Sequence, residues 1–261
     1  PSNELDTWAK VQGDRFQNMV IRGFHTELEA VYEEYNIGLS SDWRKMYAAL
    51  FAKLFPTHPY GTQTTIGLGE HLKNPSITNI KNYFNKYYVP NNVAICLSGD
   101  LNPDETVAAI EKYFGNWKPS AHIDVPQFPV QPALTAPVDT TIIGKEAPSF
   151  FMGWRAEASN SLQMDTLEIV AQLLSNGAAG LFDLDLTQKL KVQEVGAGVS
   201  DMNDYSVFYI YGQPKKGQTL QEARALALSE VEKLKKGEFS DDLLPSIVNN
   251  YKRYYYTQLD N

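Results

Sequence analysis

Cysteine is almost absent from the sequence, because Cys96 is the only one among 261 residues. A single cysteine excludes an intrachain disulfide and a zinc site built from cysteines. Cys96 lies in the apolar run Val93-Ala94-Ile95-Cys96-Leu97, so we predict that it is a small buried hydrophobic residue. This cysteine usage fits cytoplasm, an organelle matrix or a cysteine-poor periplasm equally, so the compartment of the expected soluble protein stays open.

Long apolar runs and an excess of basic charge are also missing. No run approaches the roughly 18 apolar residues of a membrane span, so we expect none. Acidic residues outnumber basic ones by 31 to 23, which gives a net charge of −8 and argues against nucleic acid as a partner. The chain is 43% hydrophobic, enough for one large domain or two medium ones.

Histidine is scarce, and its spacing excludes a common class of metal site. The four histidines are His25, His58, His71 and His122, and no two lie four residues apart with a glutamate between them. A zincin-type motif is therefore absent. We predict that His58, between Pro56 and Pro59, is a turn or packing residue. The sequence also lacks the Gly-x-Ser-x-Gly motif of serine hydrolases and a phosphate-binding loop.

The run of residues 27–36 contains the strongest candidate for chemistry. Glu27 and Glu34 are seven residues apart, two helical turns, and lie beside Val31 at the edge of an apolar stripe. A carboxylate that faces a core must be paired, protonated or bound to a cation. The alternative is a surface helix whose acids reach solvent or pair with Arg15 or Arg22.

The remaining sequence mixes helical and strand patterns, which predicts an α+β fold. Helices are predicted at 5–11, 27–36, 41–54, 76–87, 104–114, 161–174, 181–190 and 220–236, with a last helix capped by Ser240. Strands are predicted at 93–97, 140–144, 149–155, 195–199 and 206–211. Residues 119–137 hold five prolines and predict a linker.

A weak internal repeat relates the two sides of this linker. The apolar strand at 93–97 and the helix at 104–114 match the strand at 207–211 and the helix at 220–234. The two strands are offset by 114 residues. Two copies of one α+β unit explain this pattern, although strand–helix pairs are common enough for chance similarity to remain an alternative.

Several motifs in a fixed order resemble the pitrilysin/insulinase (M16) family of zinc peptidases. They begin with Glu27-x-x-Ala30-Val31-x-x-Glu34 and Pro56-x-His58-Pro59-Tyr60-Gly61. The resemblance continues at residues 72–77, 87–92, 97–100, 151–155 and 235–240, and so covers nearly the whole chain.

The resemblance implies a fold, a reaction and roles for two acids. The fold would be two related α+β domains of the LuxS/MPP-like metallohydrolase type, with the first truncated at its N-terminus. Their expected bounds are 1–118 and 138–261, joined by the linker 119–137, with the second domain incomplete at its C-terminus. The expected activity is zinc-dependent hydrolysis of peptides. In the family, the acid matching Glu34 is the third zinc ligand, and the acid matching Glu27 supports the site.

The sequence also departs from the family pattern. The His-x-x-Glu-His element, which supplies two zinc ligands and the general base, is absent. We therefore expect a fragment that lacks this N-terminal segment, is inactive alone and does not retain zinc. Its expected partners are peptide substrates, the missing segment and a second M16 half or subunit. Lys191 stands where the family has a substrate-binding Arg, and Ala197 or Gly198 stands where it has Tyr.

Two other interpretations stay open. A non-catalytic M16-like subunit, used for peptide binding or complex assembly, would explain the missing Arg and Tyr. An α+β interaction module without peptidase ancestry would require the ordered motifs to be coincidence. An intact His-x-x-Glu-His motif upstream would favour the peptidase, and a degraded one would favour the non-catalytic subunit.

Overall fold

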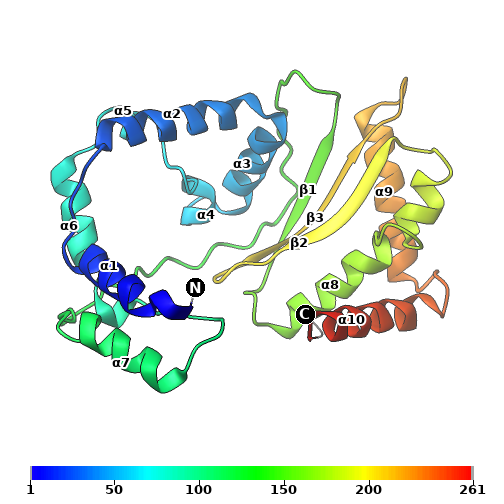
Figure 1. Cartoon of the computed structure of the whole chain (residues 1–261). Helices are drawn as coiled ribbons and strands as arrows, with labels where there is room; N and C mark the ends of the chain where they lie inside the picture. Colours follow the sequence, from blue (N-terminus) through cyan, green and yellow to red (C-terminus); the bar gives the residue numbers. More distant parts are fainter. Residues whose placement is uncertain (1, 260–261) are drawn as a thin grey trace. The chain divides into compact units, whose positions relative to one another are not determined.

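A computed structural model describes residues 2–259 and shows helices together with one small sheet (Figure 1). The helices are α1 (Leu5–Gln17), α2 (Phe24–Ser40), α3 (Asp42–Leu54), α4 (Pro59–Thr62), α5 (Gly69–Lys73), α6 (Ile77–Tyr87), α7 (Pro103–Phe114), α8 (Leu162–Leu174), α9 (Leu220–Lys235) and α10 (Leu243–Leu259). The strands are β1 (Phe150–Ala156), β2 (Glu194–Ser200) and β3 (Ser206–Gln213). Short 3₁₀ turns, η1 (Ser2–Glu4) and η2 (Pro90–Asn92), and a π-helical turn, η3 (Asp183–Thr187), complete the order. None of the helices in the described residues is long and apolar enough to cross a membrane.

The chain forms two compact units, neither of them continuous in sequence. The first unit comprises Pro1–Gly38 and Thr65–Val130, and the second comprises Leu39–Thr64 and Gln131–Asn261. These discontinuous units do not test the predicted domains at 1–118 and 138–261, and that division stays a prediction.

The first unit is built from helices, and α1 lies against α7. Gly13 allows this approach, because a Cβ there would lie 2.9 Å from the backbone oxygen of Tyr113. The Gln17 side chain donates a hydrogen bond to the same oxygen at 2.8 Å. At the other end of the contact, Asp6 accepts hydrogen bonds from Lys112 and from the hydroxyl of Tyr113.

The second unit contains the three-stranded antiparallel sheet, in the order β1-β3-β2. Because β3 is central, its backbone pairs on both sides. Its side chains alternate between the two faces of the sheet: Phe208 and Ile210 lie on one face, and Val207, Tyr209 and Tyr211 on the other.

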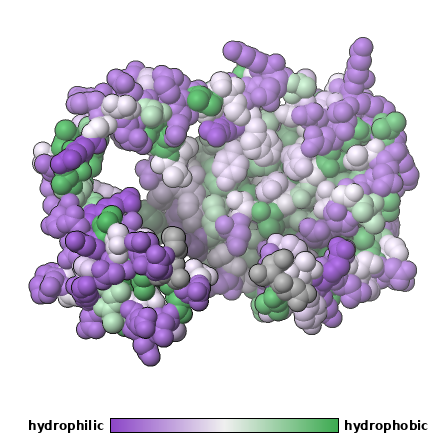
Figure 2. All heavy atoms as spheres, in the orientation of Figure 1, coloured by the Kyte–Doolittle hydropathy of each residue, from purple (hydrophilic) through white to green (hydrophobic). Residues whose placement is uncertain are grey.

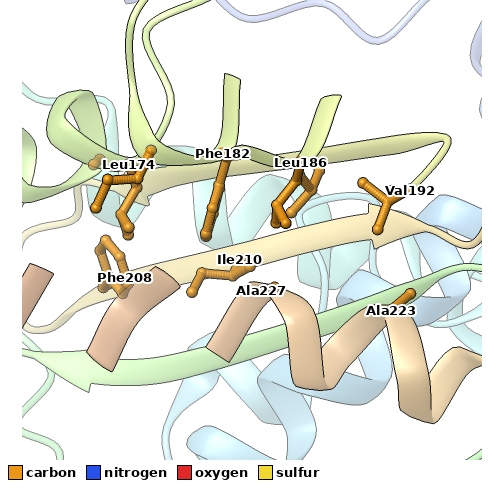
Figure 3. Close-up of a cluster of buried hydrophobic side chains, with 11 residues drawn as sticks. Leu174, Phe182, Leu186, Val192, Phe208, Ile210, Ala223 and Ala227 are labelled. Atoms are coloured by element: carbon orange, nitrogen blue, oxygen red, sulfur yellow. The ribbon is translucent and has the colours of Figure 1, made fainter. Parts of the chain in front are cut away.

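The face with Phe208 and Ile210 forms the main core. Helices α8 and α9 and the η3 turn cover it with Leu174, Phe182, Leu186, Ala223 and Ala227, all of them buried (Figure 3). On the opposite face, Phe51, Leu54 and Phe55 from the end of α3 pack against Val207. The sheet is thus covered by helices from both sides, and α3 belongs to this unit although it precedes the linker in sequence.

Arg155 on β1 fixes the segment that follows α3. Its guanidinium donates hydrogen bonds to the backbone oxygens of Leu54, Gln131 and Pro132. It also lies over the ring of Phe55, 5.4 Å from the ring centre. One side chain of β1 therefore connects the sheet to the end of α3 and to residues 131–132.

The motif residue His58 has a structural role here. It is almost completely buried, at 1% exposure. Its Nδ1 accepts a hydrogen bond from the Tyr60 backbone N–H and caps α4, which leaves Nε2 to donate to Asp204 at 3.2 Å. The prediction of a turn or packing residue is confirmed.

Two strand predictions and the burial of Cys96 were wrong. Residues 93–97 and 140–144 form no strand, and Cys96 is exposed. A strand needs a neighbouring strand to satisfy its backbone groups, and the sheet of the described residues consists of β1, β3 and β2 alone. The predicted strands at 149–155, 195–199 and 206–211 are confirmed as β1, β2 and β3.

Asp42, at the start of α3, holds the loop before β1. Its Oδ2 accepts hydrogen bonds from the backbone N–H groups of Lys145 and Glu146, and Lys45 pairs with Oδ1 at 3.1 Å. A Cβ at Gly144 would collide with this carboxylate. The Glu146 N–H, and then Lys45, lower the pKa of Asp42 below its ordinary value of 3.8.

Replacing Asp42 by Asn should reduce the stability of the chain in a pH-dependent way. A carboxyl whose pKa is lowered in the folded state adds stability above pH 3.8, and this is lost as the pH falls through the lowered pKa. The melting temperature of Asp42→Asn should therefore lie below that of the parent at neutral pH, and the gap should narrow in acid. Thermal unfolding between pH 7 and pH 2 tests this, with Asp201→Asn as control. A gap that stays constant over this range contradicts the prediction.

Candidate functional site

Helix α2 carries the two acids singled out from the sequence. It begins after Gly23, whose φ of +62° favours glycine, and Glu27 lies in its first turn, where a negative charge is favourable. Glu27 and Glu34 are both exposed, as are Glu29 and Glu33. The expected difference in burial between the two pairs of acids is absent, and none of the described residues makes an ion pair or hydrogen bond with the side chain of Glu27 or Glu34.

Aromatic contacts fix the side of α2 that bears its partly buried residues. The rings of Tyr32 and Tyr35 stack with centres 6.2 Å apart. Tyr35 lies over Gly69, where a Cβ would be 2.8 Å from the ring, and Lys73 lies 5.9 Å from the centre of the Tyr32 ring. The α5 segment therefore holds α2 through tyrosines and leaves the carboxylates free to contact other groups.

The described residues do not by themselves make a zinc site. A catalytic zinc needs three protein ligands and an open position. No group of three or more histidine, cysteine, aspartate or glutamate residues that could hold a metal occurs in the part of the chain that the structure describes. Glu34 offers one carboxylate, so the donor set is incomplete and no reaction step through a metal follows from these residues alone.

Lys191 lies in an exposed turn before β2. Leu190, the residue before it, has a left-handed backbone with φ of +52°. The turn is held by hydrogen bonds from the Lys191 N–H to Leu186, from Lys215 to the Leu190 oxygen and from Gln218 to the Lys191 oxygen. The Lys191 side chain makes no hydrogen bond or ion pair with a described residue.

The glycines of β2 are explained by tyrosines on β3. Gly196 pairs with Tyr211 and Gly198 with Tyr209 across the two strands. A Cβ on Gly196 would lie 2.6 Å from the Tyr211 hydroxyl oxygen, and one on Gly198 would lie 2.6 Å from that of Tyr209. The space beside the glycines is thus filled by neighbouring rings, and a side chain at position 198 would require Tyr209 to move.

Sequence reasoning did not single out Tyr209 and Tyr211. The signal was present, because tyrosines at alternate positions of one strand oppose glycines at alternate positions of another. Burial, and to a lesser degree the charge of Glu194, raises the pKa of Tyr211 above its ordinary value of 10.

The fold defines an α+β domain in which helices cover both faces of a small antiparallel sheet. The family model described as "Peptidase M16 inactive domain" matches residues 76–251. The chain therefore belongs to the M16 peptidase family, and residues 76–251 match its inactive type of domain.

Similar proteins agree with this assignment. The zinc protease PqqE of Helicobacter pylori is 25% identical over 227 residues, which is 83% of this chain and 49% of that protein. The crystal structure of a protease from Helicobacter pylori matches 99% of this chain and 64% of its own, with a TM-score of 0.83 and 21% identity. A peptidase M16 inactive domain from Pseudomonas fluorescens matches 96% of this chain and 61% of its own, with a TM-score of 0.77 and 14% identity.

The M16-type α+β fold expected from the sequence is confirmed by these structures. The chain spans about half the length of the curated relative that it matches, and less than two thirds of these solved structures.

Adding a methyl group at Gly198 should destabilise the second unit. Alanine normally improves a strand position held by glycine, but here the Cβ would overlap Tyr209. Gly198→Ala should therefore lower the free energy of unfolding by about 1–3 kcal/mol, the usual effect of overpacking. In a Tyr209→Leu background the same change should be neutral or stabilising. Denaturant unfolding of the four proteins in this double-mutant cycle measures the coupling, and additive effects contradict the prediction.

Proposed function

We propose that this chain is part of a zinc-dependent M16 peptidase that hydrolyses peptides, with Glu34 as a metal ligand and Glu27 as a supporting carboxylate. The observation that carries the proposal is the position of Glu34. It is an exposed acid without a partner among the described residues, two helical turns from a second such acid. A zinc-protease relative and the matching order of motifs support the assignment.

The described residues would then contribute one ligand and hold it in place. A carboxylate ligand must be presented on a rigid element with its oxygens free. The tyrosine contacts of α2 with the α5 segment meet the first requirement, and the exposure of Glu34 meets the second. The remaining ligands, zinc itself and the general base would come from outside these 261 residues, so the chain alone is inactive and does not retain zinc.

Replacing Glu34 by Gln in the full-length protein should abolish most zinc binding and peptidase activity, because an amide is a poor zinc ligand. Replacing Glu27 by Gln should reduce zinc affinity or peptidase activity by about 10–100-fold, as expected for a group that supports a ligand. Glu33→Gln, an exposed acid on the other side of α2, should change neither. The measurements are the zinc content per protein chain and the rate of peptide turnover. Wild-type values of both in Glu34→Gln would contradict the assignment of Glu34 as a metal ligand.

A second candidate is a non-catalytic M16 subunit that binds peptides or supports assembly. Two observations favour it: the matching family model describes an inactive domain, and Lys191 and Ala197 or Gly198 stand where the family has its substrate-binding Arg and Tyr. In this case a second M16 half or subunit would be the partner, and Lys191 would not serve a reaction. A full-length wild-type protein that binds no zinc and cleaves no peptide would favour this candidate over the peptidase.

A further inference from the structure

Two surface turns of the second unit are held together at one end of the sheet. The turn between η3 and β2 contains Leu190, and the turn between β3 and α9 comprises residues 214–219. The Lys215 ammonium group donates a hydrogen bond to the backbone oxygen of Leu190 at 3.2 Å, and the Gln218 side chain donates one to that of Lys191 at 3.1 Å. Gln218 also accepts a hydrogen bond from the Lys215 N–H at 3.1 Å. These contacts fix the two turns side by side at the surface.

Four exposed lysines lie on these turns and form a local positive patch. They are Lys189, Lys191, Lys215 and Lys216, which we call the lysine cluster. Asp185 pairs with Lys189 at 2.6 Å, but the side chains of Lys191 and Lys216 make no ion pair or hydrogen bond with a described residue. In Figure 2 the surface over the end of α9 nearest these turns is largely hydrophilic. The patch contrasts with the net charge of −8 of the whole chain.

An open hollow adjoins the lysine cluster. Its volume of about 580 Å³ lies within the range of ligand-binding pockets. It is lined by residues 215–218 and by one side of α9, which contributes Glu222, Ala225, Leu226 and Ser229. Glu222 is the only acid of this lining, and its carboxylate accepts hydrogen bonds from the N–H and the hydroxyl of Thr219 at the start of α9. It therefore does not neutralise a lysine of the cluster.

We propose that the lysine cluster and this hollow form a docking surface for an acidic peptide segment that carries apolar side chains beside its carboxylates. The free ammonium groups would pair with the carboxylates. Leu226 in the hollow and Leu190, which is 75% exposed, would contact the apolar side chains. A long polyanion such as nucleic acid is not the expected ligand, because a chain of net charge −8 repels it. The proposal holds whether or not the protein hydrolyses peptides.

Binding of two fluorescent peptides to the full-length protein tests the proposal. One peptide consists of glutamate and leucine, and the other has glutamine in place of each glutamate. The anisotropy of the label measures binding at low salt, with a chelator present to prevent metal-dependent cleavage. The glutamate peptide should bind more tightly, and its affinity should fall as salt is added. Equal affinities for the two peptides overturn the proposal.

Two double variants with the same change in net charge locate the binding site. Lys191→Gln with Lys216→Gln should weaken binding of the glutamate peptide by about 5–30-fold, the combined effect of two exposed ion pairs. Lys235→Gln with Lys236→Gln, at the other end of α9, should leave the affinity unchanged. Equal losses in the two double variants contradict a site at the lysine cluster.

Further variants test the charge preference and the hollow separately. Lys191→Glu with Lys216→Glu should reverse the preference, so that a peptide of lysine and leucine binds more tightly than the glutamate peptide. Ala225→Phe fills the hollow and should weaken binding, whereas Gln221→Phe, at an exposed position of α9 outside the hollow, should not. An unreversed preference, or wild-type affinity in Ala225→Phe, contradicts the proposal. Binding of a single-stranded oligothymidylate as tightly as the glutamate peptide also contradicts it.

Discussion

Backbone pairing along β3 is the constraint on which the rest of the second unit depends. Its central place satisfies backbone groups on both sides and lets its side chains form two cores at once. Phe208 and Ile210 anchor α8 and α9, and Val207 anchors the end of α3. The glycines of β2 follow from the same arrangement, because they make room for Tyr209 and Tyr211. Among the described residues, the first unit has helices of comparable length but no such strand, and Ala9 and Val89 are its only buried apolar residues.

Polar contacts add to the apolar packing that holds the α3 segment in the second unit. Arg155 collects three backbone oxygens from two separate stretches of chain, and His58 uses both ring nitrogens within the second unit. Buried polar groups of this kind are costly to leave without a partner. Residues 39–64 are therefore held by a network that would be left unsatisfied if they packed elsewhere.

Much of the fold was predictable from local pattern. Ser41, Ser76 and Ser161 begin three of the predicted helices, and in the structure each caps its helix by accepting a hydrogen bond from a backbone N–H. The prediction of a strand at 93–97 was wrong because a local pattern shows only that these residues favour a strand. A strand also needs a neighbouring strand, which the pattern does not specify. The partnership of His58 with Asp204, 146 residues apart, left no local signal. For the candidate site, the spacing of Glu27 and Glu34 predicted that they lie on the same side of one helix. It did not predict that both are exposed, because exposure depends on what covers the helix.

The incomplete set of zinc ligands and the wrongly predicted strand both lie in the first unit. Glu34 presents one carboxylate where zinc would need further ligands, and the apolar residues 93–97 form no strand; both belong to the first unit. The second unit has a paired sheet and a dense core, and its sheet face is filled by tyrosines beside glycines. In the described residues, Tyr32 and Tyr35 hold α2 against the α5 segment, and no residue of α2 is buried. Under the proposed function, these tyrosine contacts would hold the helix that carries Glu34 in place.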